Sequence, residues 1–334
     1  KIITGLRCGT FKNVAILSGA GVSCASGIPD FRSPGGLYDS LRPELLTATA
    51  QQKQLLKDNP TAVVDIRLFS VNQFPYLEVR RPFILGTAEE KWKPTISHIF
   101  VEIMHQKGIL QRLYTQNIDG LYSALNIPTH KIVNLHGSIS KIECEFCKTP
   151  YPLQKFREEV QSKIRNIYDS TDTTSPATSS NICCARCKKP RVKPATVMFG
   201  SDLPSSVWSS LQEDFPANVD LLIIAGTSLT VSPACNIVTM VSKTTPRLLI
   251  NQELVGSDLG LYFSPPSSSE PSSDLFLAGD CDAEFLKLAQ QVGWLENVYA
   301  SRGRFCDASA EAVEKAWQDM VDNKGEVGYD LIVM

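Results

Sequence analysis

The chain has 334 residues, of which 43% are hydrophobic, and a formal net charge of −2. This length suits one large domain with a smaller one, and the apolar fraction is enough for a substantial buried core. The nearly balanced charge argues against nucleic acid as a main ligand, and no run approaches the roughly 20 apolar residues of a membrane helix. We therefore expect neither direct nucleic-acid binding nor a membrane partner.

The cysteines and the first residues bear on the compartment. Six of the ten cysteines lie outside two Cys-x-x-Cys pairs and follow no disulfide framework, and the segment that begins at Lys1 lacks the apolar core of a secretory signal. These features predict an intracellular location, nuclear or cytoplasmic, with a mitochondrial one left open. The oligomeric state cannot be inferred from the sequence.

Apolar runs and helical periodicity alternate along the chain. Strands are predicted at 13–17, 109–115, 131–135, 219–225 and 247–251, the last with a partner at 195–199, and helices at 94–107, 204–215, 233–242 and 282–292. Strand followed by helix, repeated, is typical of a doubly wound α/β fold, in which helices cover both faces of a parallel sheet. Ligands of such sheets bind at the carboxyl ends of the strands.

Three segments interrupt this alternation. Residues 41–65 are polar and Gln-rich and are followed by the aromatic-containing segment 67–81, which together predict a helical excursion or lid. Residues 169–181 and 264–273 are rich in Ser, Thr and Pro, and both are predicted to be loops, the first of them mobile.

A glycine-rich turn follows the first predicted strand. Gly19, Ala20, Gly21 and Ser23 come directly after the apolar run, where small residues let backbone N–H groups approach a pyrophosphate. A simple strand-to-helix turn has the same glycines, and the third glycine of the usual dinucleotide motif is missing. The next segment strengthens the cofactor interpretation, because it combines an aromatic residue with a bidentate phosphate donor: Asp30, Phe31 and Arg32.

Polar residues also end the other predicted strands. The segments that contain these polar residues are Gln116, Asn117, Ile118 and Asp119 after the second strand, His136 after the third, Gly226, Thr227 and Ser228 after the fourth, and Asn251, Gln252 and Glu253 after the fifth. Such clusters are typical of a ligand site at one sheet edge. A lone histidine is more often structural, but His136 beside Gly137 at that edge is a candidate general base. Glu253 could accept hydrogen bonds from ribose hydroxyls.

Two Cys-x-x-Cys pairs predict a metal site. Cys144 with Cys147, and Cys184 with Cys187, supply the four thiolates that tetrahedral zinc prefers. Unrelated thiols or a disulfide pair are the alternative. We take Cys184 as the ligand and the adjacent Cys183 as a spectator. A site closed by four sulfurs is structural, so the chemistry must lie elsewhere.

Taken in order, these motifs resemble those of sirtuins, the NAD-dependent protein deacylases, from about Val14 to Trp294, and residues 249–256 and 279–282 look most like the eukaryotic class that deacetylates lysine. The resemblance implies a large Rossmann-like domain and a small zinc-ribbon domain, with NAD and an acyl-lysine peptide in the cleft between them. It also implies the domain limits: 1–40, 94–137 and 192–300 for the NAD-binding domain, 41–93 for a helical lid of the small domain, 138–191 for the zinc module and 301–334 for a C-terminal helical extension.

The resemblance further implies residue roles. His136 would be the general base, Asn117 and Asp119 would organise the nicotinamide end, and Phe31 would shield the reactive sugar carbon. The remaining cofactor contacts would come from the glycine turn, Asp30, Arg32, residues 116–118, 226–228 and 251–253, and Cys281, and the acyl-lysine tunnel from Val197, Met198, Phe199 and Gly200. In this chemistry the acyl oxygen displaces nicotinamide, the base deprotonates a ribose hydroxyl, and water finally releases free lysine and O-acyl-ADP-ribose.

Two departures from the family concern the peptide groove and the lid. Ser201 stands where an acidic residue usually follows Phe-Gly, and the polar segment 41–65 is longer than usual. The lid also lacks the Tyr-x-x-Arg pair that marks acidic-acyl specificity in some relatives. We therefore expect acetyl and aliphatic acyl-lysine as substrates and poor removal of succinyl groups, whose carboxylate would be buried without an arginine.

Other protein classes share part of this pattern. An NAD(P)-dependent dehydrogenase would need a fuller Gly-x-Gly-x-x-Gly, and a zinc-ribbon module for nucleic acid would need a basic surface with stacking aromatic residues. A mono-ADP-ribosyltransferase would use the same cofactor cleft and is the main alternative.

Overall fold

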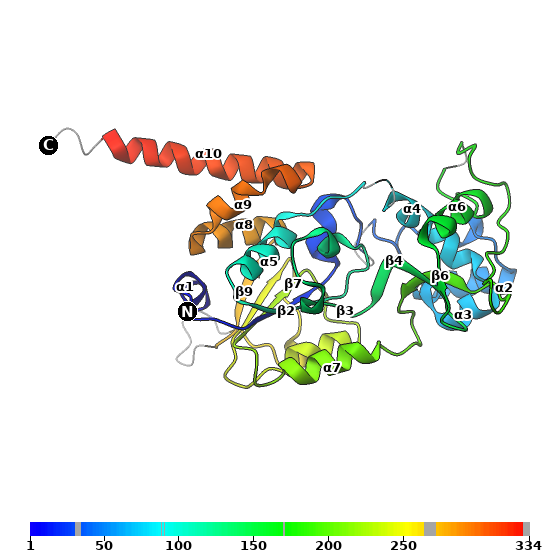
Figure 1. Ribbon diagram of the computed structural model, residues 1–334, viewed down its shortest axis with the longest axis horizontal. Helices are drawn as coiled ribbons and strands as arrows, with labels where there is room; N and C mark the ends of the chain where they lie inside the picture. Colours follow the sequence, from blue (N-terminus) through cyan, green and yellow to red (C-terminus); the bar gives the residue numbers. More distant parts are fainter. Residues whose placement is uncertain (31–34, 88, 90, 170, 264–271, 330–334) are drawn as a thin grey trace.

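The computed structural model describes residues 1–30, 35–87, 89, 91–169, 171–263 and 272–329 (Figure 1). Its centre is a six-stranded sheet in the order β3-β2-β1-β7-β8-β9, in which every neighbouring pair is parallel. The strands are β1 Val14–Ser18, β2 Leu110–Thr115, β3 Ile132–Asn134, β7 Leu221–Ala225, β8 Arg247–Asn251 and β9 Leu275–Ala278. The order reverses direction between β1 and β7, which creates the crevice where doubly wound folds bind ligands.

Successive residues of β1 point to opposite faces of the sheet. Val14 and Ile16 belong to one hydrophobic cluster, and Ala15 and Leu17 belong to another. The first cluster is completed by α1 Ile2–Arg7, α5 Ile96–Gln106, α8 Cys281–Val292 and α9 Leu295–Ala300, and the second by α7 Ser205–Asp214 and the 3₁₀ helix η6 Ala234–Thr239. Helices therefore cover both faces, which confirms the predicted doubly wound α/β class.

A third hydrophobic cluster lies in the second lobe, on the right in Figure 1. It combines a helical insert with a three-stranded antiparallel sheet in the order β5-β4-β6. The insert contains η2 Pro43–Leu45, α2 Ala50–Asp58, η3 Pro60–Val64, α3 Ile66–Val71 and α4 Phe74–Gly86; the sheet contains β4 Gly137–Cys144, β5 Pro150–Tyr151 and β6 Val192–Thr196, and α6 Leu153–Lys163 packs beside it. Segment 41–81 is thus helical, as predicted.

The segment between the two Cys-x-x-Cys pairs is anchored to this lobe. Asp172 accepts an ion pair from Arg81 at 3.0 Å, and both side chains are largely buried. The side chain of Ser179 donates to Glu78 at 2.5 Å. These contacts tether the predicted loop 169–181 to α4 at Asp172 and Ser179, and its mobility stays a prediction.

One prediction about strands is wrong, and one strand was missed. Residues 195–199 do not pair with β8, because β7 and β9 occupy both edges of that strand. They overlap β6 instead, which is the edge strand of the small sheet, and Pro194 suits an edge because it has no N–H to donate. Strand β9 was not predicted, and it follows a segment predicted as a loop, of which residues 264–271 lie outside the described ranges.

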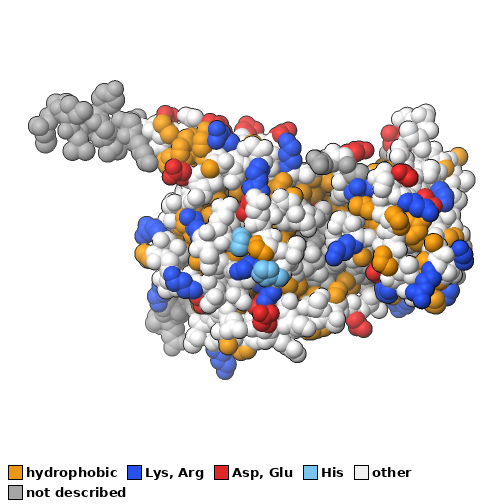
Figure 2. Space-filling view, in the orientation of Figure 1, with side chains coloured by type: hydrophobic (Ala, Val, Ile, Leu, Met, Phe, Trp, Pro, Cys, Tyr) orange, Lys and Arg blue, Asp and Glu red, His pale blue; other side chains and the backbone are white. Residues whose placement is uncertain are grey.

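The C-terminal part is helical, as the sequence predicts. After η8 Arg302–Arg304, α10 Asp307–Tyr329 begins against the 3₁₀ helix η1 Ala20–Ser26 and then extends away from the body (Figure 1). The shorter 3₁₀ turns are η4 Leu121–Ala124, η5 Thr129–Lys131 and η7 Ser257–Leu259. None of the helices in the described ranges combines the length and apolarity that a membrane crossing requires. On the face shown in Figure 2, basic side chains are interspersed with acidic and uncharged ones.

Candidate active site

A cavity of about 540 Å³ lies at the carboxyl ends of β1, β2, β7 and β8. One wall comes from the loops that follow these strands, and the other from the helical insert and the segment after β6. The cavity thus occupies the crevice created where the strand order reverses.

The glycine turn packs directly against the loop after β7. The N–H of Gly21 donates to the carbonyl of Gly226 at 2.9 Å, and a Cβ added to Gly21 would lie 2.7 Å from the Cα of Gly226. Gly226 itself has φ of +60°, a conformation that favours glycine. The glycines therefore allow two loops to approach closely and bring Gly19, Ala20 and Gly21 to the cavity wall beside Thr227 and Ser228.

Asn117 is held at the end of β2 by hydrogen bonds. Its side-chain amide donates to the carbonyl of Gly19 at 3.0 Å and to the hydroxyl of Ser23 at 3.1 Å. Ser23 in turn donates to Asp119 at 2.8 Å. Asn117 lines the cavity, whereas Ser23 and Asp119 are not among its lining residues. Those two predicted site residues therefore lie behind Asn117 and position it.

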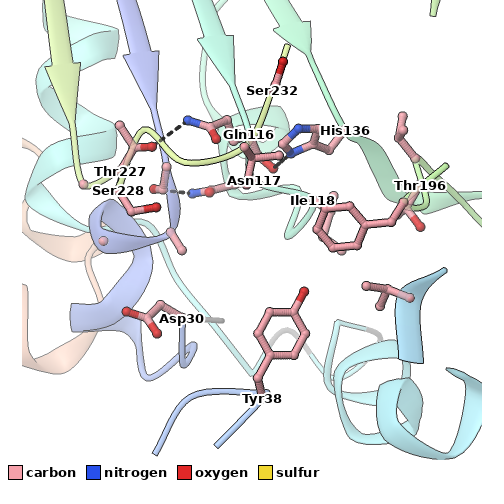
Figure 3. A pocket seen from close by; sticks show the side chains of 18 of the residues that line it. Asp30, Tyr38, Gln116, Asn117, Ile118, His136, Thr196, Thr227, Ser228 and Ser232 are labelled. Atoms are coloured by element: carbon pink, nitrogen blue, oxygen red, sulfur yellow. Dashed lines mark hydrogen bonds between the residues drawn. The ribbon is translucent and has the colours of Figure 1, made fainter. Parts of the chain in front are cut away.

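Gln116, which directly follows β2, contacts both Thr227 and His136. Its side-chain amide donates to the hydroxyl of Thr227 at 2.9 Å, and its backbone carbonyl lies 3.0 Å from Nδ1 of His136 (Figure 3). Burial lowers the pKa of His136, and the hydrogen bond to Gln116 opposes this shift. Since the carbonyl can only accept, Nδ1 carries the proton, and the neutral ring keeps a lone pair on Nε2. His136 lines the cavity and is suited to act as a base.

Residues beyond β8 line another part of the cavity. Asn251, Gln252 and Glu253 belong to the lining, with Asp280 and Cys281 at the start of α8. Burial raises the pKa of the Cys281 thiol, so this sulfur stays protonated and is a poor nucleophile. Carboxylate and amide groups here could hold sugar hydroxyls of a dinucleotide.

The predicted acyl-lysine segment also lines the cavity. Val197, Met198, Phe199 and Gly200 all contribute, and the backbone of Phe199 is already bonded to the insert through Val64 at 3.0 Å and Ile66 at 3.0 Å. A peptide that pairs with this segment must therefore use other backbone groups. Met198 is buried and Phe199 is more than a third exposed.

The opposite wall contains residues that the sequence reasoning did not identify. Val64, Tyr76 and Arg80 line the cavity from the insert, and Tyr38, which precedes the insert, lies across the cavity from His136 (Figure 3). The aromatic-containing segment 67–81 shows no clear period, so its cavity-facing side could not be read. The available signal was the pair Arg80 and Arg81 inside an otherwise apolar helix. Asp30 lines the cavity as expected, whereas Phe31 and Arg32 lie outside the described residues.

The four predicted metal ligands converge. Their sulfur atoms all lie within 4.8 Å of one another, with Cys144 3.6 Å from Cys187 and Cys147 3.7 Å from Cys184. A tetrahedron with Zn–S bonds of about 2.3 Å requires sulfurs about 3.8 Å apart, so the cluster fits zinc. Cys183 is exposed and does not belong to this group. Four thiolates complete the coordination shell, so the site has a structural role.

Comparison with known proteins agrees with this architecture. The model of the Sir2 family matches residues 19–233. The chain is 34% identical over 297 residues to the NAD-dependent deacetylase sir2A of Dictyostelium discoideum, and the match covers 88% of this chain and 51% of that protein. It is 31% identical over 325 residues to the NAD-dependent protein deacetylase hst2-2 of Emericella nidulans, and the match covers 96% of this chain and 80% of that protein.

A third relative is the NAD-dependent protein deacetylase sirtuin-2 of Danio rerio, 33% identical over 296 residues, which cover 86% of this chain and 69% of that protein. The chain spans about half the length of the Dictyostelium protein. The matched region contains the glycine turn, Asn117, His136 and all four cysteines of the metal cluster. By its fold, its cavity and these matches, the chain belongs to the Sir2 family.

Proposed function

We propose that the protein is an NAD-dependent protein lysine deacylase that releases nicotinamide and O-acyl-ADP-ribose. The observation that carries this proposal is one continuous cavity that is lined by the glycine turn, by His136 and by the segment 197–200. A cofactor and an acyl-lysine side chain could meet there within reach of one base. The relatives' names support deacylation over mono-ADP-ribosylation, because each names a deacetylase.

The lining residues fit NAD in both shape and chemistry. The close approach of Gly21 to Gly226 brings the glycine turn to the cavity wall without bulky side chains, which leaves room for a pyrophosphate, and Glu253 supplies an acceptor for ribose hydroxyls. The cofactor would supply an electrophilic sugar carbon. Asn117 would orient the nicotinamide end, and His136 would accept a proton from a ribose hydroxyl through Nε2.

The burial of His136 favours this role. Burial disfavours the charged ring, so His136 is neutral over a wider pH range than an exposed histidine and is ready to accept a proton. The zinc site would stabilise the small lobe without entering the reaction. Protein substrates are the partners that this activity implies.

A product assay tests the proposal. The purified chain is incubated with NAD and a peptide that carries acetyl-lysine, and nicotinamide, free-lysine peptide and O-acetyl-ADP-ribose are quantified together. The proposal predicts equal amounts of all three and no product in the absence of NAD. ADP-ribose attached to protein, with the acetyl group retained on the peptide, would instead identify a mono-ADP-ribosyltransferase.

All ten cysteines are thiols in the structure, including the six outside the zinc cluster. The thiols support our assignment of the protein to a reducing intracellular compartment.

A further inference from the structure

A completely buried lysine contacts both the first Cys-x-x-Cys pair and the segment that enters the cavity. Lys193, on β6, is 0% exposed. Its ammonium donates to the carbonyls of Pro194 at 3.0 Å and Thr196 at 2.6 Å and pairs with Glu145 at 2.8 Å. These contacts use all three N–H donors of the ammonium. Because lysine is almost never fully buried unless it is paired, this arrangement calls for an explanation.

The anionic partner of the lysine belongs to the first cysteine pair. Glu145 lies between Cys144 and Cys147 in the sequence. Its backbone N–H donates to the carbonyl of Arg191 at 2.7 Å, two residues before Lys193. The first cysteine pair is therefore joined to β6 by a backbone hydrogen bond and by a buried ion pair.

The two carbonyl partners lie where the pairing of β6 with β4 is irregular. Ala195 pairs with Ser138 of β4. The preceding residue, Pro194, pairs with Ile142, so the register shifts between these two β4 residues. Such a shift interrupts the ladder of backbone hydrogen bonds. Lys193 supplies side-chain hydrogen bonds to the backbone on both sides of Ala195.

The segment that Lys193 holds leads directly into the cavity wall. Thr196 and Val197 both line the cavity. The backbone N–H of Val197 donates to the carbonyl of His136 at 2.9 Å. Contacts thus run from Glu145 through Lys193 to Thr196. The next residue belongs to the proposed acyl-lysine segment and is bonded to the backbone of the proposed base.

We propose that Lys193 is a positioning residue for acyl-lysine binding: it holds Thr196 and Val197 where the substrate requires them, and Glu145 couples that position to the first cysteine pair. The inference rests on the proposed deacylase function. Lys193 is not among the described residues that line the cavity, so it acts on the substrate only through its neighbours. The residues proposed to bind NAD belong to other segments, 19–21, 226–228 and 251–253. We therefore expect loss of Lys193 to impair peptide binding and not NAD binding.

Peptide binding is the first readout. Lys193→Met removes the three polar contacts and keeps an unbranched side chain. Lys148→Met is the matched control, because it removes the other cation that pairs with Glu145, at 2.7 Å, and the Lys148 side chain is 60% exposed. We expect Lys193→Met to raise the Kd of a fluorescent acetyl-lysine peptide, measured by anisotropy, about 10-fold or more, since a misplacement of about 1 Å is enough for such a loss. Lys148→Met should bind the peptide as the wild-type chain does.

Steady-state kinetics separate positioning from a general loss of structure. Lys193→Met should raise the KM for the peptide and leave the KM for NAD within about 2-fold of the wild-type value. Zinc content and the midpoint of thermal unfolding are measured on the same samples, and the kinetics are run well below that midpoint. Unchanged peptide binding, or equal increases in the KM for peptide and for NAD, would overturn the inference.

Glu145→Gln decides the question if Lys193→Met does not fold. This variant keeps a hydrogen-bond acceptor beside Lys193 but removes the negative charge that balances the buried ammonium. We expect it to retain zinc and to raise the Kd of the peptide about 3-fold or more. Normal peptide binding by a folded Glu145→Gln would remove the proposed coupling.

The outcomes also separate this inference from the proposed function. If the wild-type chain deacylates the acetyl-lysine peptide and both substituted chains bind it normally, Lys193 has no positioning role and the deacylase function stands. If the wild-type chain neither binds nor deacylates the peptide, the proposed function itself fails, and this inference with it.

Discussion

Nδ1 of His136 lies 3.0 Å from the backbone carbonyl oxygen of Gln116, at the end of the strand that also presents Asn117 to the cavity. This contact fixes the proton on Nδ1 and leaves Nε2 as the basic nitrogen of the ring. The same residue, Gln116, bonds through its side chain to Thr227. Gln116 therefore positions both His136, the proposed base, and Thr227, which lies in the loop that packs against the glycine turn.

The pH dependence of turnover should reflect the burial of His136. Its pKa is lowered, so the neutral form persists below the pH at which an exposed histidine becomes protonated. Activity should therefore be lost on acidification only below the ordinary histidine pKa, and should not fall as the pH rises through that value. The measurement is a profile of log(kcat/KM) for an acetyl-lysine peptide against pH. An acidic limb centred above the ordinary value would contradict this environment.

Gly21→Ala should impair NAD binding. The added methyl would lie 2.7 Å from the Cα of Gly226, so the two loops would have to separate. We expect a KM for NAD raised about 10-fold or more, because the separated loops would no longer form the wall against which the pyrophosphate is proposed to lie. Gly303→Ala is the matched control, because a Cβ at Gly303 meets no atom within 4 Å and its φ is not in the left-handed range. Similar NAD affinity in both variants would show that the close approach is not required.

Zinc binding should depend on the four clustered cysteines and not on Cys183. Cys187→Ser should release the metal and lower the midpoint of thermal unfolding, because metal binding is coupled to folding of the module. Cys183→Ser should retain about one zinc per chain, since Cys183 is exposed and outside the cluster. Elemental analysis of both purified variants decides the assignment. Metal lost from Cys183→Ser and kept by Cys184→Ser would reverse it.

The C-terminal helix α10 should stabilise the large domain through Ser309. Its buried hydroxyl donates to Asp282 at 2.5 Å, and the same carboxylate accepts the backbone N–H groups of Ile96 and Ser97 at the start of α5. Ser309→Ala should lower the free energy of unfolding by about 1–3 kcal/mol, because it removes one partner of a buried carboxylate.

Chemical denaturation measures this loss of stability. Ser209→Ala is the control, since the Ser209 hydroxyl is exposed and has only a 3.4 Å contact on its own helix. Equal stability of the two variants would remove Ser309 from the network.

Much of the large domain could be predicted because its strands are continuous apolar runs. Val14–Ser18 and Leu221–Ala225 are buried on both faces of the sheet, so their composition alone indicates parallel strands. Polar residues directly after such strands must meet at one edge, which is why Asn117, His136 and Thr227 were identified together. The cysteine spacing predicted the four metal ligands for a similarly local reason.

The remaining features depend on contacts between distant segments. The pairing of β6 with β4 cannot be read from periodicity, since an edge strand with Pro194 carries no distinctive pattern. Strand β9 is only four residues long, Leu275–Ala278. The cavity-facing position of Arg80 depends on how α4 is rotated against the small lobe, which is decided by packing.

The most direct test of the central claim compares the wild-type chain with His136→Ala in two assays on one acetyl-lysine peptide. The first measures free-lysine peptide and O-acetyl-ADP-ribose, and the second measures exchange of labelled nicotinamide into NAD. The account predicts that the variant loses deacylation while NAD binding and nicotinamide exchange persist, because His136 acts after nicotinamide has left. Near-normal deacylation by the variant would contradict the account and remove His136 from the mechanism.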